Sequence, residues 1–97
     1  MFTKPEKRLI DENYFDIIME TEDYIEFKSK NTDHCWIIKK IKYTNTKKMC
    51  LYHKHSIEER YYHQHYEALT VKQVIDNIKG HDEYVLKIRL LEKSILK

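Results

Sequence analysis

The chain has 97 residues, of which 41% are hydrophobic and 35% are charged, and its formal net charge is +2. This length excludes a multidomain enzyme, so we expect a single α+β domain over residues 1–97. No apolar run reaches the roughly 20 residues that span a bilayer, and the N-terminus lacks an apolar signal segment. We therefore expect a soluble, cytoplasmic protein without membrane contact. The single glycine excludes a glycine-rich phosphate loop and a dinucleotide-binding fingerprint.

The first predicted element is a short helix. Thr3 and Glu6 have capping-box spacing, and Pro5 is tolerated in a first helical turn because its missing N–H would be unpaired there anyway. We expect the helix to end near residues 10–13, with Leu9 and Ile10 facing inward.

Two segments of alternating polarity follow, at residues 14–19 and 24–30, on either side of the polar stretch 20–23. A period of two is typical of strands, and a polar stretch between two such runs predicts a β-hairpin. A continuous helix over residues 6–20 is the competing interpretation.

Three more strands are expected in the middle of the chain, at residues 34–43, 49–57 and 61–66, because these runs are rich in β-branched and aromatic side chains. Composition predicts turns at residues 31–33 and 44–47.

The period then changes to that of a helix. Thr70 and Gln73 form a second capping box, and apolar residues follow at positions 71, 74, 75 and 78, the spacing of one helical face. We expect Gly80 to end this helix and Asp82 to cap a last one, in which Tyr84, Ile88, Leu91 and Ile95 recur at spacings of 4, 3 and 4. Alternation over residues 84–90 leaves a terminal strand as the alternative.

These elements predict a two-layer α+β sandwich. We expect an antiparallel sheet of four to five strands, an N-terminal helix, and one or two C-terminal helices packed on one face.

Charge is segregated along the chain. Residues 1–27 carry eight acidic and three basic side chains, whereas residues 28–54 carry eight lysines and one acidic residue. Lysines interleaved with aromatic rings are typical of nucleic-acid binding. The candidate phosphate contacts are Lys39, Lys40, Lys42, Lys47, Lys48 and Lys54. The alternative is a solvated basic face that lies near the acidic N-terminal segment.

The two cysteines, Cys35 and Cys50, form no CxxC pattern. We expect reduced thiols that pack as small hydrophobic side chains, although the sequence does not exclude a disulfide.

Four of the six histidines form two identical patterns, His53-Lys54-His55 and His63-Gln64-His65. Residues i and i+2 of a strand share a face, so pairing of 53 with 65 and of 55 with 63 would gather four imidazoles in one patch. Neutral imidazole is a common ligand of Zn²⁺, and the predicted metal ligands are His53, His55, His63 and His65. Acid–base cleavage of a phosphodiester, assisted by Lys54 and Arg60, is a further alternative.

The leading interpretation is a non-catalytic binding module, with no catalytic residues and no required cofactor. Tyrosine is enriched at protein interfaces and surrounds the histidines. The predicted contact surface contains Trp36, Tyr52, His53, His55, Tyr62, His63 and His65. This surface faces solvent only if the helices cover the sheet face of Cys35 and Ile37; if they cover the other face, these side chains become core.

The Lys-, Ile-, Tyr- and Asn-rich composition, together with the stretches 21–24 and 31–36, resembles small accessory proteins of phages and mobile elements from low-GC Gram-positive bacteria. Such proteins often inhibit a host enzyme or a defence system, anti-CRISPR proteins among them. The resemblance implies inhibition by occlusion of a host protein in the host cytoplasm, for example a nuclease or defence complex. It assigns no role to any residue.

Overall fold

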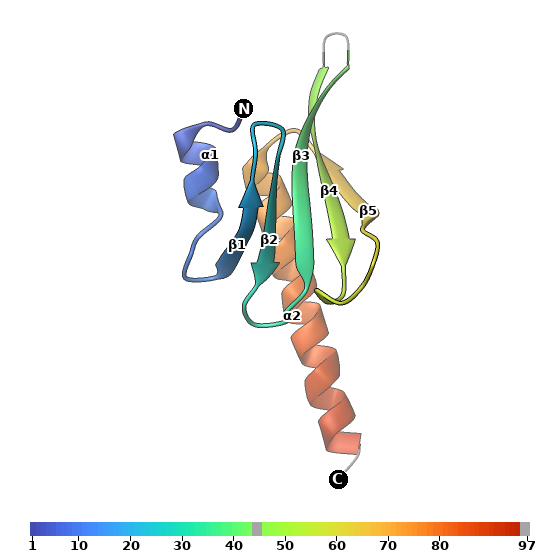
Figure 1. The fold of residues 1–97 in the computed structure, drawn as a ribbon. Helices are drawn as coiled ribbons and strands as arrows, with labels where there is room; N and C mark the ends of the chain where they lie inside the picture. The colour runs from blue at the N-terminus through green and yellow to red at the C-terminus, as the bar shows by residue number, and fades with distance from the viewer. Residues whose placement is uncertain (44–45, 96–97) are drawn as a thin grey trace.

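Five antiparallel strands lie side by side in chain order in the computed structural model, which describes residues 1–43 and 46–95 (Figure 1). The strands are β1 (Phe15–Glu20), β2 (Tyr24–Ser29), β3 (Cys35–Tyr43), β4 (Thr46–Lys54) and β5 (His63–Ala68). A short helix, α1 (Lys4–Leu9), precedes the sheet and a long helix, α2 (Val71–Ile95), follows it. The predicted α+β class, with an N-terminal helix and a C-terminal helix on an antiparallel sheet, is confirmed.

Helix α1 begins as the sequence predicts. The Thr3 hydroxyl accepts a hydrogen bond from the backbone N–H of Glu6 at 3.2 Å, and the Glu6 carboxylate accepts one from the N–H of Thr3 at 2.8 Å. The helix ends at Leu9, earlier than expected. Ile10 is buried as predicted, whereas Leu9 is exposed, because the chain leaves the helix between them.

The hairpin of β1 and β2 is confirmed, and the alternative helix over residues 6–20 is wrong. The turn at 31–33 is also confirmed: Asp33 adopts a left-handed φ of 65° and its N–H donates to the Ser29 carbonyl at 2.9 Å. Of the predicted turn at 44–47, residues 44 and 45 lie outside the described residues, and Thr46 and Lys47 belong to β4.

The register between β4 and β5 differs from the predicted one. His53 pairs with His63 rather than with His65, and β4 ends at Lys54, before His55. A bulge contributes one residue of this two-residue shift, because β5 passes from Gln64 to Tyr66 while β4 passes from Tyr52 to Leu51, which leaves His65 without an opposite residue.

Helix α2 is continuous across Gly80, so the predicted break there, the cap at Asp82 and the alternative terminal strand are all wrong. The helix continues because Ile75, Ile78 and Asp82 lie on one buried face, and this packing outweighs the roughly 1 kcal/mol by which glycine disfavours a helix interior. The predicted N-terminal capping box is present: the Thr70 hydroxyl accepts from the N–H of Gln73 at 3.2 Å, and the Gln73 side chain accepts from the N–H of Thr70.

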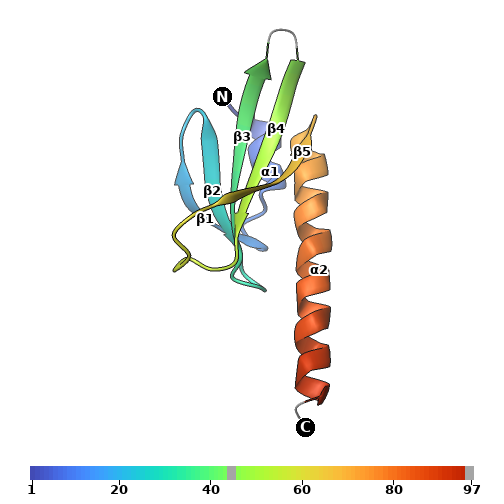
Figure 2. The ribbon, with the colours of Figure 1, turned by 90° about the vertical axis from the view of Figure 1, so that its right-hand side faces the viewer.

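The N-terminal half of α2 lies against one face of the sheet (Figure 2). The fully buried side chains of the core include Phe27, Trp36, Ile38, Leu51, Val74 and Ile78. The helix therefore covers the sheet face of Trp36. This is the second of the two alternatives considered from the sequence, in which the histidine patch becomes partly core. No helix in the described ranges 1–43 and 46–95 has the length and apolar content needed to cross a bilayer.

Candidate metal centre

All six histidines converge on one region between the sheet and α2. The ring of His53, on β4, is the centre of this group. Its centroid lies 4.8–5.4 Å from the ring centroids of His34, His55, His63, His65 and His81. We call these six side chains the histidine cluster.

Three members of the cluster bring ligand nitrogens together. His34 immediately precedes β3, His53 lies on β4 and His81 lies on α2, and one nitrogen of each falls within 4.8 Å of the other two. His34 Nδ1 lies 2.8 Å from His53 Nε2. Only His53 belongs to the ligand set predicted from the sequence.

The strand register explains why His34 and His53 meet. Trp36 on β3 pairs with His53 on β4, and His34 lies two residues before Trp36, so all three side chains point to the face that α2 covers. Trp36 stacks on His53 with ring centroids 4.3 Å apart, and its indole N–H donates to the Ser29 hydroxyl at 2.9 Å.

Burial keeps the inner imidazoles neutral. His53 and His34 are 2% and 5% exposed. Loss of hydration on burial lowers the pKa of His53 to about 3 and that of His34 to about 4, and repulsion from the neighbouring imidazolium forms adds to both shifts. Burial also lowers the pKa values of His65 and His81.

His81 carries an unsatisfied polar atom. Its Nδ1 is buried and has no hydrogen-bond partner among the described residues. A buried imidazole nitrogen without a partner is uncommon in folded proteins. Such an atom commonly binds a ligand or an ordered water.

The carboxylate of Asp82, the residue after His81, is held by hydrogen bonds. Asp82 is completely buried and accepts hydrogen bonds from the Tyr14 hydroxyl at 2.7 Å and from the Thr32 hydroxyl at 3.0 Å. Burial, followed by the hydrogen bond to Asp82, raises the pKa of Tyr14 to about 12. Asp82 thus ties α2 to the segment before β1 and to the turn before β3.

The other three histidines form the rim of the cluster. His55, His63 and His65 are exposed. His55 is held by Glu59, whose carboxylate accepts from the His55 N–H at 3.0 Å and lies 2.9 Å from His55 Nδ1. The predicted convergence of the four paired histidines is thus correct, although the register that was expected to produce it is not.

The seven residues of the predicted contact surface do not share one exposed face. Trp36 and His53 are buried, which contradicts their assignment to a surface. Tyr52 neighbours His53 in β4 and therefore points to the opposite face of the sheet. Tyr62 donates its hydroxyl to Glu26 at 2.7 Å and is half-buried. Only His55, His63 and His65 of that set are exposed.

The six candidate phosphate-binding lysines do not form one basic surface either. Lys54 is buried, and its ammonium donates to the carbonyls of Ile57 and Glu59, so it is not a surface residue. Lys40 pairs with Glu6 at 2.7 Å and Lys48 lies 3.7 Å from Glu67. Lys39, Lys42 and Lys47 are exposed, and Lys39 points away from Lys40 because neighbours in a strand alternate. The pairing of Lys40 with Glu6 agrees with the alternative in which basic and acidic segments lie together.

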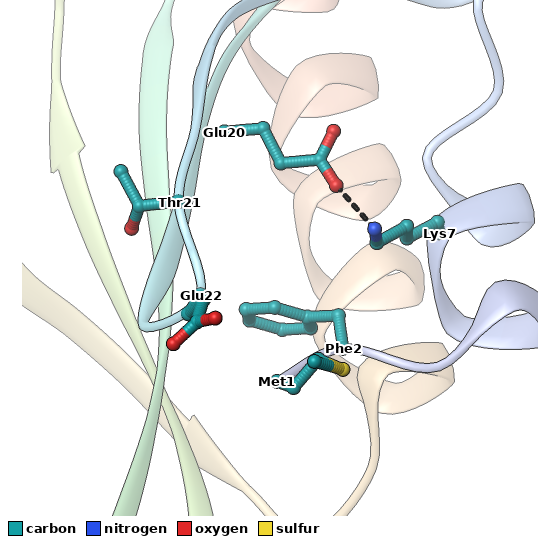
Figure 3. A pocket seen from close by; sticks show the side chains of 6 residues that line it. All are labelled: Met1, Phe2, Lys7, Glu20, Thr21 and Glu22. Carbon is teal, nitrogen blue, oxygen red and sulfur yellow. Dashed lines mark ion pairs between the residues drawn. The ribbon is translucent and has the colours of Figure 1, made fainter.

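A shallow hollow also lies between the N-terminus and the β1–β2 turn, with a volume of about 420 Å³ (Figure 3). Its principal polar feature is the ion pair of Lys7 and Glu20, at 2.6 Å, which Figure 3 shows spanning from α1 to β1. The two charges satisfy each other, and this hollow has no cluster of chemically active groups.

Two of the three inner histidines were not identified from the sequence. His81 follows Val74 and Ile78 at spacings of 7 and 3, which places it on the buried face of α2, and this periodicity was a usable signal. His34 had no comparable signal, because its approach to His53 depends on the register of β3 with β4.

Comparison of the chain with protein-family models, with curated proteins and with solved structures returned no match. The histidine cluster is therefore the feature of this chain that indicates a function.

Proposed function

We propose that the protein is a non-catalytic domain that binds a transition-metal ion, with Zn²⁺ as the reference ion, through His34, His53 and His81. The observation that carries this proposal is the meeting of three imidazole nitrogens within 4.8 Å, from the turn before β3, from β4 and from α2, in a region where two of the rings are buried.

The distances suit a metal after a small adjustment. Tetrahedral Zn²⁺ with Zn–N bonds of about 2.0–2.1 Å places ligand nitrogens about 3.3–3.4 Å apart. The nitrogens of His34 and His53 are 2.8 Å apart and those of the triad span at most 4.8 Å. Movements of about 1 Å or less, within the reach of small side-chain rotations, would bring all three to bonding distance.

Protonation also favours the site. Metal ligands must be deprotonated, and the lowered pKa values of His34 and His53 keep both rings neutral at physiological pH. His81 supplies a nitrogen whose hydrogen-bonding capacity is unused. His65 lies 5.1 Å from His53 and 5.2 Å from His81 between ring centroids. His55 is equally near, at 4.9 Å from His53 and 5.3 Å from His34, but its Nδ1 faces the Glu59 carboxylate, so His65 is the better candidate for a fourth ligand position.

A structural role fits this site better than hydrolysis. Hydrolytic zinc sites use a nearby carboxylate as general base. Within the described part of the chain, Asp82 is held by two hydroxyl groups and Glu59 by His55. A metal bound to His81 and to both sheet histidines would join α2 to the sheet.

The test is titration of the chelator-treated protein with Co²⁺ and Zn²⁺. Tetrahedral Co²⁺ gives intense visible absorption, which Zn²⁺ should displace at one equivalent. Replacement of His34 and His81 by Gln should weaken binding at least tenfold, because each removes one ligand, and circular dichroism verifies that each variant folds.

The matched control is the double variant His55→Gln/His63→Gln, which removes two exposed imidazoles of the cluster and leaves the triad intact. Retained affinity in this variant supports the buried triad. Loss of binding in it, with retention in the His34 and His81 variants, would instead support the ligand set predicted from the sequence. Absence of stoichiometric Co²⁺ and Zn²⁺ binding by the wild type would refute the proposal.

Occlusion of a host protein and nucleic-acid binding through the lysines stay predictions from the sequence. The same preparation addresses the second one, because binding to phosphates weakens steeply as salt concentration rises.

A further inference from the structure

The C-terminal half of α2 extends beyond the sheet as an arm (Figures 1 and 2), which Arg89 ties to the turn before β3 by a hydrogen bond of 3.0 Å to the Thr32 carbonyl. The last buried side chain of the helix is Asp82, and the remaining residues, 83–95, form an arm that no described strand covers. We call residues 83–95 the helical arm.

The helical arm carries an apolar stripe. Tyr84, Ile88, Leu91 and Ile95 follow one another at spacings of 4, 3 and 4, which places them on one narrow face of the helix. Their exposed fractions are 64%, 37%, 53% and 81%. Four large apolar side chains in line on an exposed helix face leave a surface that water solvates poorly, and a second helix would cover it.

The residue types on this stripe favour two strands in a parallel coil. In heptad notation Ile88 and Ile95 occupy a positions, and Leu91 and Tyr84 occupy d positions. β-branched residues at a with leucine at d favour parallel dimers over higher oligomers.

The flanking charges indicate a second copy of this chain as the partner. Lys87 occupies a g position and Glu92 the following e position, the two positions that face each other across a parallel coil. Two copies related by a two-fold axis would thus form two Lys87–Glu92 ion pairs. Within the described residues neither side chain forms an ion pair in the monomer.

An antiparallel arrangement would form no ion pairs between these two side chains. It places g opposite g and e opposite e, so Lys87 would face Ser94 and Glu92 would face Val85. Neither contact is an ion pair. The sequence of the arm therefore distinguishes the two orientations.

We propose that the protein forms a parallel homodimer through the helical arm, with Tyr84, Ile88, Leu91 and Ile95 at the interface and with reciprocal ion pairs between Lys87 and Glu92. Packing of residues 71–82 against the sheet forms the first turns of α2, so the arm extends an existing helix and does not have to nucleate a new one. With only two heptads, the dimer is weak and its population depends on protein concentration.

The test is sedimentation velocity in the presence of a chelator, over about 10 μM to 1 mM protein, a range that brackets weak association. The chelator removes metal bridging between exposed histidines. We expect a monomer–dimer equilibrium. Leu91→Lys should abolish it, whereas the control Leu90→Lys, at a comparably exposed leucine outside the stripe, should not.

Charge exchange tests the orientation. Lys87→Glu should weaken dimerisation at least tenfold, because it replaces each ion pair across the interface with two opposed carboxylates, and the double variant Lys87→Glu/Glu92→Lys should restore it. The circular dichroism spectrum of each variant verifies that the helix is intact.

A wild type that stays monomeric throughout would overturn the proposal. So would a dimer that resists Leu91→Lys, since its interface would lie elsewhere. A dimer that is lost in Leu91→Lys but indifferent to both charge variants would overturn the parallel arrangement. These readouts do not involve metal, so the proposal stands or fails separately from the metal centre.

Discussion

His34 Nδ1 and His53 Nε2 lie 2.8 Å apart in the interior of the protein. At this distance one nitrogen donates a proton and the other accepts it, so the two rings must adopt complementary tautomers. Protonation of both rings would set two N–H groups against each other. The contact therefore holds together only while at least one ring is neutral, which is also the form that binds a metal ion.

The first prediction concerns pH. The pKa values of His34 and His53 are about 4 and 3 in the folded protein and near 6.5 in the unfolded chain, so between these values the unfolded state binds more protons. Their stabilising contribution is complete above about pH 6.5 and is lost as the pH falls. We expect the free energy of unfolding of the metal-free protein, measured with urea, to decrease by on the order of 3 kcal/mol from pH 7.5 to pH 5.

The carboxylates with lowered pKa values, Glu6 and Glu59, titrate below this window and do not obscure it. A double variant His34→Gln/His53→Gln serves as the control and should show a shallower pH dependence. A wild-type stability that is constant between pH 5 and 7.5 would contradict the burial of these rings.

The second prediction concerns Asp82. Asp82→Asn weakens the acceptor of two buried hydroxyl hydrogen bonds, from Tyr14 and Thr32. Hydrogen bonds to charged groups contribute about 1.5–3 kcal/mol each, so we expect a loss of about 2–4 kcal/mol in the free energy of unfolding. Asp76→Asn is the matched control on the same helix, because Asp76 is exposed and forms an ion pair with Lys72, and it should change stability by less than about 0.5 kcal/mol. Equal effects of the two variants would show that the Asp82 network is not important to stability.

The third prediction concerns the glycine inside α2. A Cβ atom at Gly80 would meet no atom within 4 Å, and the residue has no positive φ. Gly80→Ala should therefore stabilise the protein by about 0.5–1 kcal/mol, since alanine restricts the unfolded chain and favours the helix. Chemical denaturation at pH 7.5 measures this change. Destabilisation would mean that the helix is broken at Gly80, as the sequence had suggested.

The fourth prediction concerns the thiols. Cys35 and Cys50 are free and buried, and burial raises the pKa of each. Cys35 pairs with Lys54 and Cys50 with Lys39 across the same two strands, which sets them about 13 Å apart along the sheet, too far for a disulfide. We expect both thiols to react with an aromatic disulfide reagent at least ~100-fold more slowly in the native protein than in denaturant. Rapid labelling of the native protein would contradict their burial.

Local signals in the sequence predicted most of the elements. Both capping boxes, the first hairpin and the turn at residues 31–33 depend on neighbouring residues, and all are present. The error at Gly80 has a different origin. A glycine near a helix end and a glycine inside a helix look alike in sequence, and only the burial of Asp82 beyond it keeps the helix continuous.

Only part of the candidate site could be predicted from the sequence. The i, i+2 spacing of the paired histidines predicted their convergence, because strand periodicity is a local property. The bulge at His65 and the contribution of His34 and His81 were not predictable in this way. They follow from how strands and helix are placed against one another, over separations of 19 to 47 residues.

The sequence by itself determined most of the strands and helices, and it predicted that four of the six histidines gather in one patch. The tertiary structure decided which face of the sheet α2 covers. Alternation makes both faces of β3 partly apolar, so local pattern did not separate them, whereas packing of Trp36, Ile38 and Leu51 beneath Val74 and Ile78 did. That choice buries His53 and brings His81 to it. The same choice leaves the end of α2 beyond the edge of the sheet, because the helix is longer than the sheet that it crosses.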